Sequence, residues 1–334
     1  MRALLCRAFG PLSNLHLEDV PAPTLAPGQV LIDVHACGIN FFDGLQVAGQ
    51  YQIKPPFPFA PGAEVSGVIT AVGDGVDALS GLRPGVRVLA FIRYGGLVEQ
   101  LATEAWRVVP IPDAMDDATA AAFPIVYSTS YHALHDRAHL GAGETLLVLG
   151  AAGGVGLTAV ELGSIMGARV IAAASTSEKL ELCRSRGAEE VIDYATDDLR
   201  ARVKAITNGR GVDVVYDPVG DRYTEPCVRS LAPGGRLLVV GFAAGAIPKL
   251  PLNLLLLKQA AAVGVFWGEF ATTRQNENAA NLAQLLAWYG EGRLRPHLSA
   301  RFPFEKGREA IELVMNRGAT GKVVVLVKSS PVPL

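Results

Sequence analysis

The sequence predicts an α/β protein in which a doubly wound parallel sheet follows a smaller β-rich domain. Up to about residue 124 the chain is rich in Gly, Pro and Val, and its short apolar runs are separated by turn-forming residues. From residue 145 on, continuous apolar runs alternate with helix-forming segments. That alternation is typical of parallel strands whose two faces are both covered by helices.

In the first part, three apolar runs have the residue types of β-strands. They are residues 29–37, 64–73 and 85–91. Glycine-containing turn sequences punctuate them at 26–28, 73–75 and 83–85. The pattern predicts a small domain built on an irregular, partly closed barrel. A helix-forming segment, residues 116–138, comes next, and either Asp116 or Asp117 could cap its start.

The second part reads as strands joined by helices. The expected strands are residues 145–150, 169–174, 190–194, 212–217 and 236–241. A further helix over 274–290 leads to a last strand over 321–328. No internal repeat interrupts this order, so one covered parallel sheet is expected.

Composition excludes several classes of protein. A formal net charge of −2 and a pI near 6.3 argue against a nucleic-acid or anionic-membrane surface. Polar residues interrupt the apolar stretch 250–267, so a membrane span is not expected there. Cys6, Cys37, Cys183 and Cys227 lie far apart and form no C-x-x-C pair. Free thiols and the lack of a signal-peptide pattern predict a cytoplasmic protein.

A glycine turn follows the strand expected at 145–150. Residues 151–156 read Ala-Ala-Gly-Gly-Val-Gly, a G-x-G-x-x-G pattern with alanine in its first position. Gly153 would let the backbone approach a pyrophosphate, and Gly156 would let the helix pack close to the strand. Because the turn joins a strand to a helix, it predicts a dinucleotide site. The alternative is a tight turn that binds nothing.

The end of the next strand predicts which dinucleotide binds. An NAD site usually has an acidic residue there that binds the ribose 2′-hydroxyl. This chain has Ser175 and hydroxyl neighbours, and then Lys179, which suit a 2′-phosphate. NADPH is therefore favoured. The alternative is that Lys179 is a solvated residue of the helix start and that either cofactor binds.

Several motifs together resemble the medium-chain dehydrogenase/reductases, specifically the zinc-free NADPH:quinone oxidoreductases. The motifs are residues 38–43, 58–73, 121–134, 151–156, 216–220 and 318–325. The resemblance implies a GroES-like catalytic domain over 1–124, completed by 268–334, and a Rossmann NADPH-binding domain over 125–267. It also implies a homodimer in which the strand near 260–267 pairs with its two-fold mate.

The same resemblance bears on metals. Zinc-dependent relatives carry Cys where this chain has Asn40, and a His-Glu pair where it has Ala63 and Glu64. Cys37 lies away from the ligand position, and no metal is expected. His132, His135 and His139 share the spacing of one helix face and could in principle bind zinc. A polar face between helices is the favoured interpretation.

The resemblance also supplies candidate site residues. Asn40, Tyr51 and Asp43 are implied to line the catalytic pocket, with Asn40 or Tyr51 donating to an oxyanion. Asp43 could instead cap its loop, and Tyr51 could be a packing aromatic. The implied cofactor contacts are Thr129, Ala152, Gly153, Gly154, Val155, Ser175, Lys179, Tyr194, Gly241, Phe242, Phe266, Trp267 and Lys322.

These features predict an enzyme that uses NADPH to reduce quinones or α,β-unsaturated carbonyls by hydride transfer without a metal. Conjugated acceptors suit such a site because the added hydride leaves a delocalised anion. One alternative is an enoyl-thioester reductase. The other is a non-catalytic NADPH-binding scaffold or sensor. No nucleic acid or membrane partner is expected.

Overall fold

The computed structural model describes residues 1–77 and 80–328, which form two compact units. Unit 1 comprises Met1–Ile125 and Pro296–Leu334, and unit 2 comprises Val126–Arg295. The first boundary falls within one residue of the expected one. The chain returns to unit 1 at Pro296 and not at the expected residue 268, because residues 268–295 pack within unit 2.

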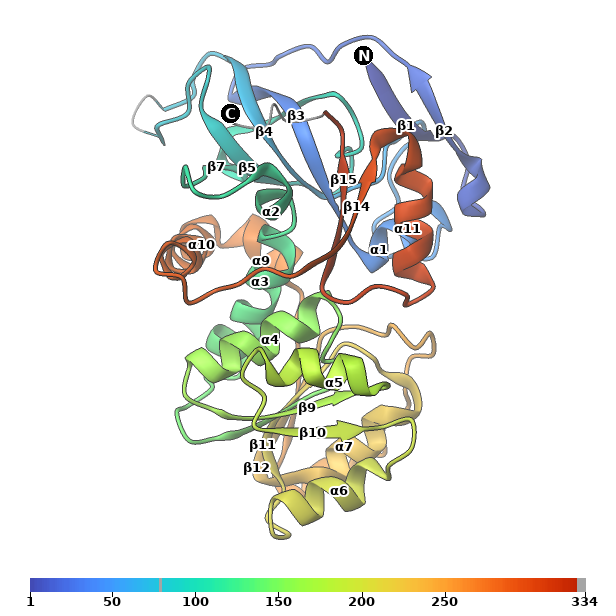
Figure 1. The fold of residues 1–334 in the computed structure, drawn as a ribbon, viewed down its shortest axis with the longest axis vertical. Helices are drawn as coiled ribbons and strands as arrows, with labels where there is room; N and C mark the ends of the chain where they lie inside the picture. Colours follow the sequence, from blue (N-terminus) through green and yellow to red (C-terminus); the bar gives the residue numbers. More distant parts are fainter. Residues whose placement is uncertain (78–79, 329–334) are drawn as a thin grey trace. The chain divides into compact units, whose positions relative to one another are not determined.

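Unit 1 is built mainly on β-strands (Figure 1). Its strands are β1 (Arg2–Cys6), β2 (Leu15–Asp19), β3 (Gln29–Ile39), β4 (Glu64–Val72), β5 (Arg87–Phe91), β6 (Gln100–Glu104), β7 (Val108–Pro110), β14 (Leu298–Pro303) and β15 (Lys322–Leu326). Its helices are α1 (Phe41–Val47), α2 (Asp117–Ala121) and α11 (Gly307–Met315), with 3₁₀ turns η1 (Leu12–Asn14), η3 (Ala105–Arg107) and η6 (Phe304–Lys306). The main sheet runs in the order β14-β15-β3-β4-β5-β7, and β6 also pairs with β3.

The long strand β3 organises unit 1 because it pairs antiparallel with β4, β6 and β15. Alternate residues of its first half, such as Val30, Ile32 and Val34, are fully buried, as the period of a half-covered strand requires. β15 brings the C-terminal part of the chain beside the end of β3, so Val323 lies opposite Ile39. This pairing sets the position of Lys322, the first residue of β15.

Unit 2 is a six-stranded parallel sheet in the order β10-β9-β8-β11-β12-β13. Its strands are β8 (Thr145–Val148), β9 (Arg169–Ala174), β10 (Glu190–Asp193), β11 (Val212–Asp217), β12 (Leu231–Val239) and β13 (Ala261–Gly264). Its helices are α4 (Gly154–Ile165), α5 (Ser177–Arg184), α6 (Leu199–Ile206), α7 (Thr224–Ser230), α8 (Asn253–Lys258), α9 (Trp267–Thr273) and α10 (Gln275–Gly290), with a 3₁₀ turn η5 (Asp221–Tyr223). α4 and α5 cover one face, and α6 and α7 the other (Figure 1). This is the doubly wound Rossmann order, so the predicted fold class is confirmed.

The single helix expected over 116–138 is instead three segments. α2 is followed by α3 (Pro124–Tyr131), which crosses the boundary between the units, and by the π-helical η4 (His132–Arg137). Pro124 lacks an N–H and cannot continue the first helix, but it suits the first position of a new one. Asp116 caps α2, accepting from the Thr119 backbone N–H at 2.8 Å.

α9 and α10 belong with unit 2 because aromatic side chains fasten them to α3 and η4. The Trp288 ring lies 5.7 Å from the Tyr131 ring, and the Phe270 ring stacks on His132 at 4.0 Å. These contacts explain why the second unit extends to Arg295.

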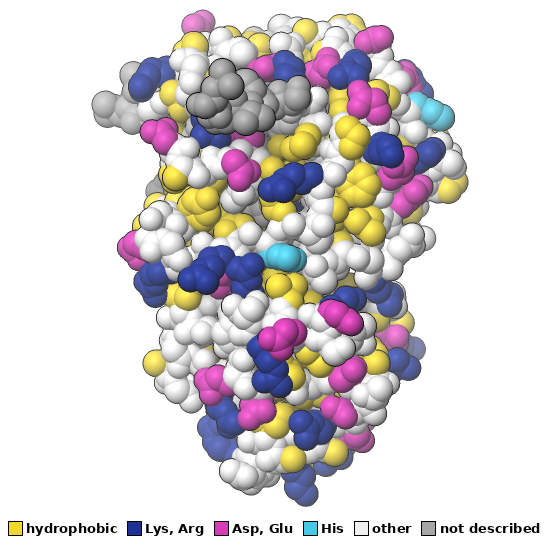
Figure 2. Space-filling view, viewed as in Figure 1, with side chains coloured by type: hydrophobic (Ala, Val, Ile, Leu, Met, Phe, Trp, Pro, Cys, Tyr) yellow, Lys and Arg dark blue, Asp and Glu magenta, His cyan; other side chains and the backbone are white. Residues whose placement is uncertain are grey.

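The distribution of charged side chains and the hydropathy of the helices agree with the near-neutral, mixed composition of the chain. On the face shown in Figure 2, basic and acidic side chains are interspersed and form no broad field of one sign. Among the described residues, no helix has both the length and the apolar character needed to cross a bilayer.

Candidate functional site

The glycine turn of unit 2 adopts the geometry of a nucleotide-binding turn. α4 begins at Gly154 with no side chain capping it, so its first N–H groups remain available to a ligand. A Cβ on Gly156 would lie 2.2 Å from the Gly150 carbonyl oxygen, which explains why only glycine fits there. Gly150 has φ +55° and makes the sharp turn that the motif's first glycine usually provides. The sequence analysis missed Gly150, although it stands directly before the motif.

Most predicted cofactor residues of unit 2 follow the carboxyl ends of its parallel strands. Ser175 follows β9, Tyr194 follows β10, Gly241 lies two residues past β12, and Phe266 two residues past β13. The sheet order reverses between β8 and β11, which is where open α/β sheets bind their ligands. The topology thus brings these residues to one edge of the sheet.

A buried carboxylate shapes the loop after β11. Asp217 accepts from the backbone N–H groups of Val219 and Gly220 at 2.9 and 2.8 Å, and from the Thr224 hydroxyl at 2.8 Å. All of its acceptor oxygens therefore serve the loop, and Asp217 is a structural residue of this edge. Its place in the 216–220 motif was the available signal, but the motif alone did not reveal its role.

The end of β9 has the polar groups expected for a 2′-phosphate. The Thr176 hydroxyl accepts from the Lys179 backbone N–H at 3.3 Å and so caps α5. The Lys179 ammonium forms no ion pair with any described residue. Lys179, a half-buried residue four positions after Ser175, can therefore bind an anion without first breaking a salt bridge.

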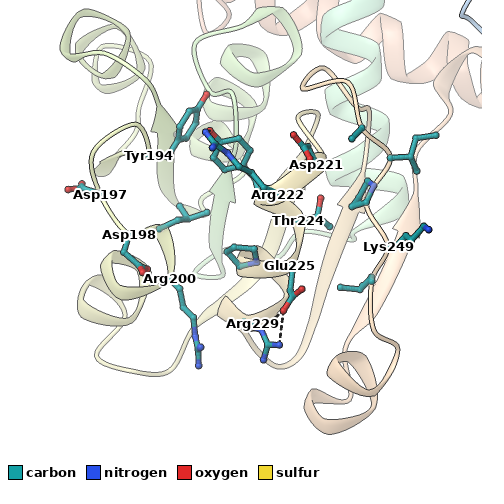
Figure 3. A pocket seen from close by; sticks show the side chains of 17 residues that line it. Tyr194, Asp197, Asp198, Arg200, Asp221, Arg222, Thr224, Glu225, Arg229 and Lys249 are labelled. Atoms are coloured by element: carbon teal, nitrogen blue, oxygen red, sulfur yellow. Dashed lines mark hydrogen bonds and ion pairs between the residues drawn. The ribbon is translucent and has the colours of Figure 1, made fainter.

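A pocket of about 760 Å³ opens beside Tyr194 (Figure 3). The Tyr223 ring lies 5.0 Å from the Tyr194 ring, and the Arg222 guanidinium lies 5.0 Å above the Tyr223 ring. Figure 3 shows the Tyr194 and Arg222 side chains near one another among those that line the pocket. The sequence analysis found Tyr194 but missed Arg222 and Tyr223, because no motif marks them.

The remaining predicted cofactor residues differ in accessibility. Phe242 and Phe266 are 37% and 46% exposed and can contact a ligand. The buried Trp267 donates its indole N–H to Asn278 at 2.8 Å, so its ring belongs to the packing of α9 on α10. Ala152 is buried, whereas Gly153, Gly154, Val155 and Thr129 are half-buried.

In unit 1, a buried polar cluster joins Asn40, Glu64 and Lys322. The Lys322 ammonium donates to the Ile39 carbonyl at 2.7 Å, to the Asn40 amide oxygen at 2.8 Å and to Glu64 Oε1 at 2.6 Å. The Asn40 amide nitrogen donates to the same Glu64 oxygen at 2.9 Å. Glu64 Oε2 accepts from the Ile125 backbone N–H at 2.9 Å. The expected contact of Lys322 with a cofactor stays a prediction, and its three ammonium hydrogens already have partners in the protein.

Asp43 holds the backbone around Asn40. Its carboxylate accepts from the Asn40 N–H at 2.7 Å and from the Gly62 N–H at 3.2 Å. Complete burial raises the pKa of Asp43 to about 7, against these two hydrogen bonds and the charge of Lys322, which lower it. This geometry favours the role of Asp43 as a cap over direct catalysis.

Tyr51 stacks on Phe42 with ring centroids 5.2 Å apart. Its hydroxyl forms no hydrogen bond with the described residues, and partial burial raises the pKa of the phenol. Tyr51 is thus a packing aromatic whose hydroxyl remains free to donate to a ligand.

The donor set around Asn40 does not fit a zinc ion. Of the two carboxylates present, Glu64 is bound by the Lys322 ammonium and Asp43 accepts from two backbone N–H groups, so both already have partners in the protein. Ala63 has no ligating atom, and burial raises the pKa of the Cys37 thiol well above its ordinary value. Across the part of the chain that the structure describes, no group of three His, Cys, Asp or Glu side chains could hold a metal.

The three histidines on one helix face do not converge on a point. His132 and His135 each bond Asp136 through Nδ1 at 2.7 Å, and Asp136 also accepts from Asn281 of α10 at 2.8 Å. His139 has φ +49° and lies past the end of η4. The structure therefore agrees with a polar face between helices.

Comparisons with known proteins agree with this architecture. Residues 26–113 match the model of the alcohol dehydrogenase GroES-like domain, and residues 154–287 match that of the zinc-binding dehydrogenases. The quinone oxidoreductase-like protein 2 of Rattus norvegicus is 38% identical, over 98% of this chain and 92% of its own length.

Two solved structures are similar over nearly the whole chain. A mycobacterial protein complexed with NADPH has a TM-score of 0.91 and 30% identity, over 98% of this chain and 99% of its own. The Escherichia coli quinone oxidoreductase complexed with NADPH also has a TM-score of 0.91, with 26% identity over 98% and 100%. The chain accordingly belongs to the quinone oxidoreductase group of the medium-chain dehydrogenase/reductase family.

Proposed function

We propose that this protein is an NADPH-dependent reductase of quinones or α,β-unsaturated carbonyls that works without a metal. The observation that carries the proposal is the donor set around Asn40, in which the Lys322 ammonium is bonded to the Glu64 carboxylate. A site without a Lewis acid suits acceptors that conjugation already activates.

The reaction consumes one hydride and one proton for each acceptor. When bound, NADPH supplies a hydride from its reduced nicotinamide ring and becomes NADP⁺. The acceptor gains two electrons with the hydride, and its oxygen carries the charge of the resulting enolate or quinol anion. A solvent proton, delivered directly or through Tyr51, neutralises that anion, and a Tyr51 that donates regains its proton from solvent. Asn40 and Tyr51 are the groups we assign to the acceptor oxygen, because each has an N–H or O–H without a partner among the described residues.

NADPH is the cofactor we assign to unit 2. The open start of α4 suits its pyrophosphate, and Ser175 and the unpaired Lys179 suit its 2′-phosphate. Two relatives that share this fold were crystallised with NADPH, which supports the assignment.

A panel of acceptors tests the proposal. The purified protein is mixed with NADPH or NADH and with quinones, short enones and acyl-thioesters in turn, and the loss of nicotinamide absorbance is followed. We expect turnover with quinones or enones, faster with NADPH, and unchanged by a chelator. Stoichiometric zinc, with activity lost on chelation and restored by adding zinc, would contradict the metal-free mechanism.

The same panel separates the two alternatives. Oxidation of NADPH by acyl-thioesters alone would identify an enoyl-thioester reductase. Tight binding of NADPH without turnover on any acceptor would favour a scaffold or sensor. The second Asn40 N–H, which has no partner among the described residues, favours a reductase over a scaffold, because it can stabilise a negative oxygen.

We further propose a homodimer that works in a reducing compartment such as the cytoplasm. Cys6, Cys37, Cys183 and Cys227 are all buried and unpaired, which suits such a compartment. The end strand β13 and the exposed leucines of α8 offer a surface for a second copy.

A further inference from the structure

The Asn40 side chain is held at both ends by groups that allow only one orientation. Its oxygen accepts from the Lys322 ammonium at 2.8 Å, and its nitrogen donates to Glu64 Oε1 at 2.9 Å. An ammonium can only donate and a carboxylate can only accept. A flipped amide would place its NH₂ group against the Lys322 ammonium and its oxygen against the Glu64 carboxylate. These two charged groups therefore fix the orientation of the Asn40 amide.

The hydrogen bonds among Asn40, Glu64 and Lys322 use all but one of their side-chain donor hydrogens. Lys322 donates its three ammonium hydrogens to Ile39, Asn40 and Glu64, and both Glu64 carboxylate oxygens accept hydrogen bonds. The Asn40 amide has two hydrogens, and Glu64 accepts one. The second is the only hydrogen of the Asn40–Glu64–Lys322 side chains with no partner among the described residues.

We infer that Lys322 and Glu64 are a positioning pair for the reduction: they aim the second Asn40 N–H at the oxygen of the acceptor and polarise it. This inference rests on the proposed function. The acceptor it implies is a carbonyl compound whose oxygen becomes negative in the transition state, where a fixed donor is most effective. A buried ammonium on the amide oxygen strengthens the donor at the other end.

Strand pairing alone does not account for a buried ion pair here. β15 already pairs with β3 through four residues on each strand, from Val323 opposite Ile39 to Leu326 opposite Ala36. Glu64 is completely buried and Lys322 is 5% exposed, so both ions lose most of their hydration. Apolar residues of similar volume commonly serve stability as well as such a pair does. A positioning role gives the charges a function that apolar residues could not supply.

Removing both charges together tests the inference. The variant Lys322→Met/Glu64→Gln keeps side chains of similar length. It removes both charges of the pair, whereas Lys322→Met alone would leave the Glu64 carboxylate buried without its ion-pair partner. We expect its kcat to fall about ten- to a hundredfold, because the Asn40 donor is no longer fixed. The Kd for NADPH and the KM for the acceptor should stay within about twofold, because all three Lys322 ammonium hydrogens are bonded within the protein and none is left for the cofactor. Asn40→Asp, which removes the donor itself, should lower kcat at least as much.

The control is Lys328→Met, which removes an exposed lysine just past the end of β15 that pairs with Asp33. It should leave kcat unchanged. A double variant that folds and keeps the wild-type kcat, or that loses only NADPH affinity, would overturn the inference while leaving the proposed function intact.

A readout without turnover keeps the two hypotheses separate. The side-chain amide signals of Asn40 in ¹⁵N NMR spectra can be assigned by their loss in Asn40→Asp. In the wild type we expect one slowly and one rapidly exchanging hydrogen, and in the double variant two rapidly exchanging ones. If the wild type reduces no acceptor, the proposed function fails, and with it the assigned acceptor. Unchanged Asn40 signals in the double variant would show that the charges do not orient the amide.

Discussion

At the scale of single residues, Asp43 links the architecture of the site to pH. Burial raises the pKa of its carboxyl from 3.8 to about 7. Between these two values the folded protein holds a proton that the unfolded chain releases. Stability contributed by this group is therefore complete below pH 4 and is lost as the pH rises through about 7.

The variant Asp43→Asn measures this linkage. At pH 4 it should be less stable than the wild type by about 1–3 kcal/mol, because an amide has one acceptor oxygen for two backbone N–H groups. As the pH rises to 8, the wild type should lose part of that advantage, whereas the neutral amide does not titrate. Urea unfolding at several pH values gives the difference. An advantage that grows with pH would mean that the carboxylate is stabilised by Lys322 more than burial destabilises it.

Lys179 should decide between the two nicotinamide cofactors. Its ammonium has no ion pair with a described residue, so its removal breaks no salt bridge there. Lys179→Ala should raise the Kd for NADPH about tenfold and leave that for NADH unchanged, since only NADPH carries the 2′-phosphate. Fluorescence titration with both cofactors measures this. Lys204→Ala, an exposed lysine on α6, is the control. Equal losses for both cofactors would remove Lys179 from the 2′-phosphate site.

Residue identities indicated which residues gather around Asn40 better than they indicated the contacts those residues make. Asn40 and Asp43 stood in a recognisable motif, but nothing local showed that Asp43 bonds the Gly62 backbone. Lys322 was expected beside the cofactor, yet it bonds residues 258 and 282 positions earlier in the chain. Such contacts depend on the pairing of β15 with β3, which a single sequence does not reveal.

At the scale of elements, the turn between β8 and α4 has little room for change. A Cβ on Gly156 would meet the Gly150 oxygen at 2.2 Å and the Ala151 Cα at 2.9 Å, both of which are backbone atoms. Gly156→Ala should therefore displace the start of α4, lower stability by about 1–3 kcal/mol and weaken NADPH binding.

The matched control for this turn is Gly290→Ala at the end of α10, where a Cβ would have open space. It should be neutral or stabilise the protein by up to about 1 kcal/mol, because alanine favours helix. Thermal unfolding and NADPH titration of both variants give the comparison. A Gly156→Ala protein with wild-type stability and affinity would show that the helix can shift without cost.

Elements with strong periodicity were predicted well, and irregular ones were not. The strands from β8 to β11 and the helix α10 lie where the sequence placed them, within two residues at each end. The segment 116–138 failed as one helix because Pro124 breaks it and η4 widens to a π-helix. Widening of this kind depends on tertiary contacts such as the stacking of Phe270 on His132.

At the scale of the whole molecule, the chain passes between its two units at residues 125–126 and again at 295–296. The first crossing was predictable because strand composition gives way there to helix composition. The second was misplaced at 268, since α9 and α10 could serve either unit until their aromatic contacts with Tyr131 and His132 are known.

The proposed homodimer would use one edge of the parallel sheet. β13 is the last strand in its order, and its residues Ala261 and Ala262 are exposed. In α8, the helix that precedes β13 in the chain, Leu256 and Leu257 are 77% and 76% exposed, and Leu252 just before the helix is 75% exposed. An open strand edge next to exposed leucines would aggregate unless a partner covers it, and a second copy offers the same edge in return.

The double variant Leu256→Glu/Leu257→Glu should convert the proposed dimer to a monomer, because four like charges would meet across a two-fold interface. Light scattering after size exclusion measures the mass, and the predicted value for one chain is 35.2 kDa. Lys204→Glu, which changes charge on α6, should stay dimeric. Since the leucines contribute nothing to the glycine turn or to Asn40, NADPH affinity should persist in the monomer. A wild type that is itself monomeric at high concentration would reject the interface, and the exposed leucines would then need another partner.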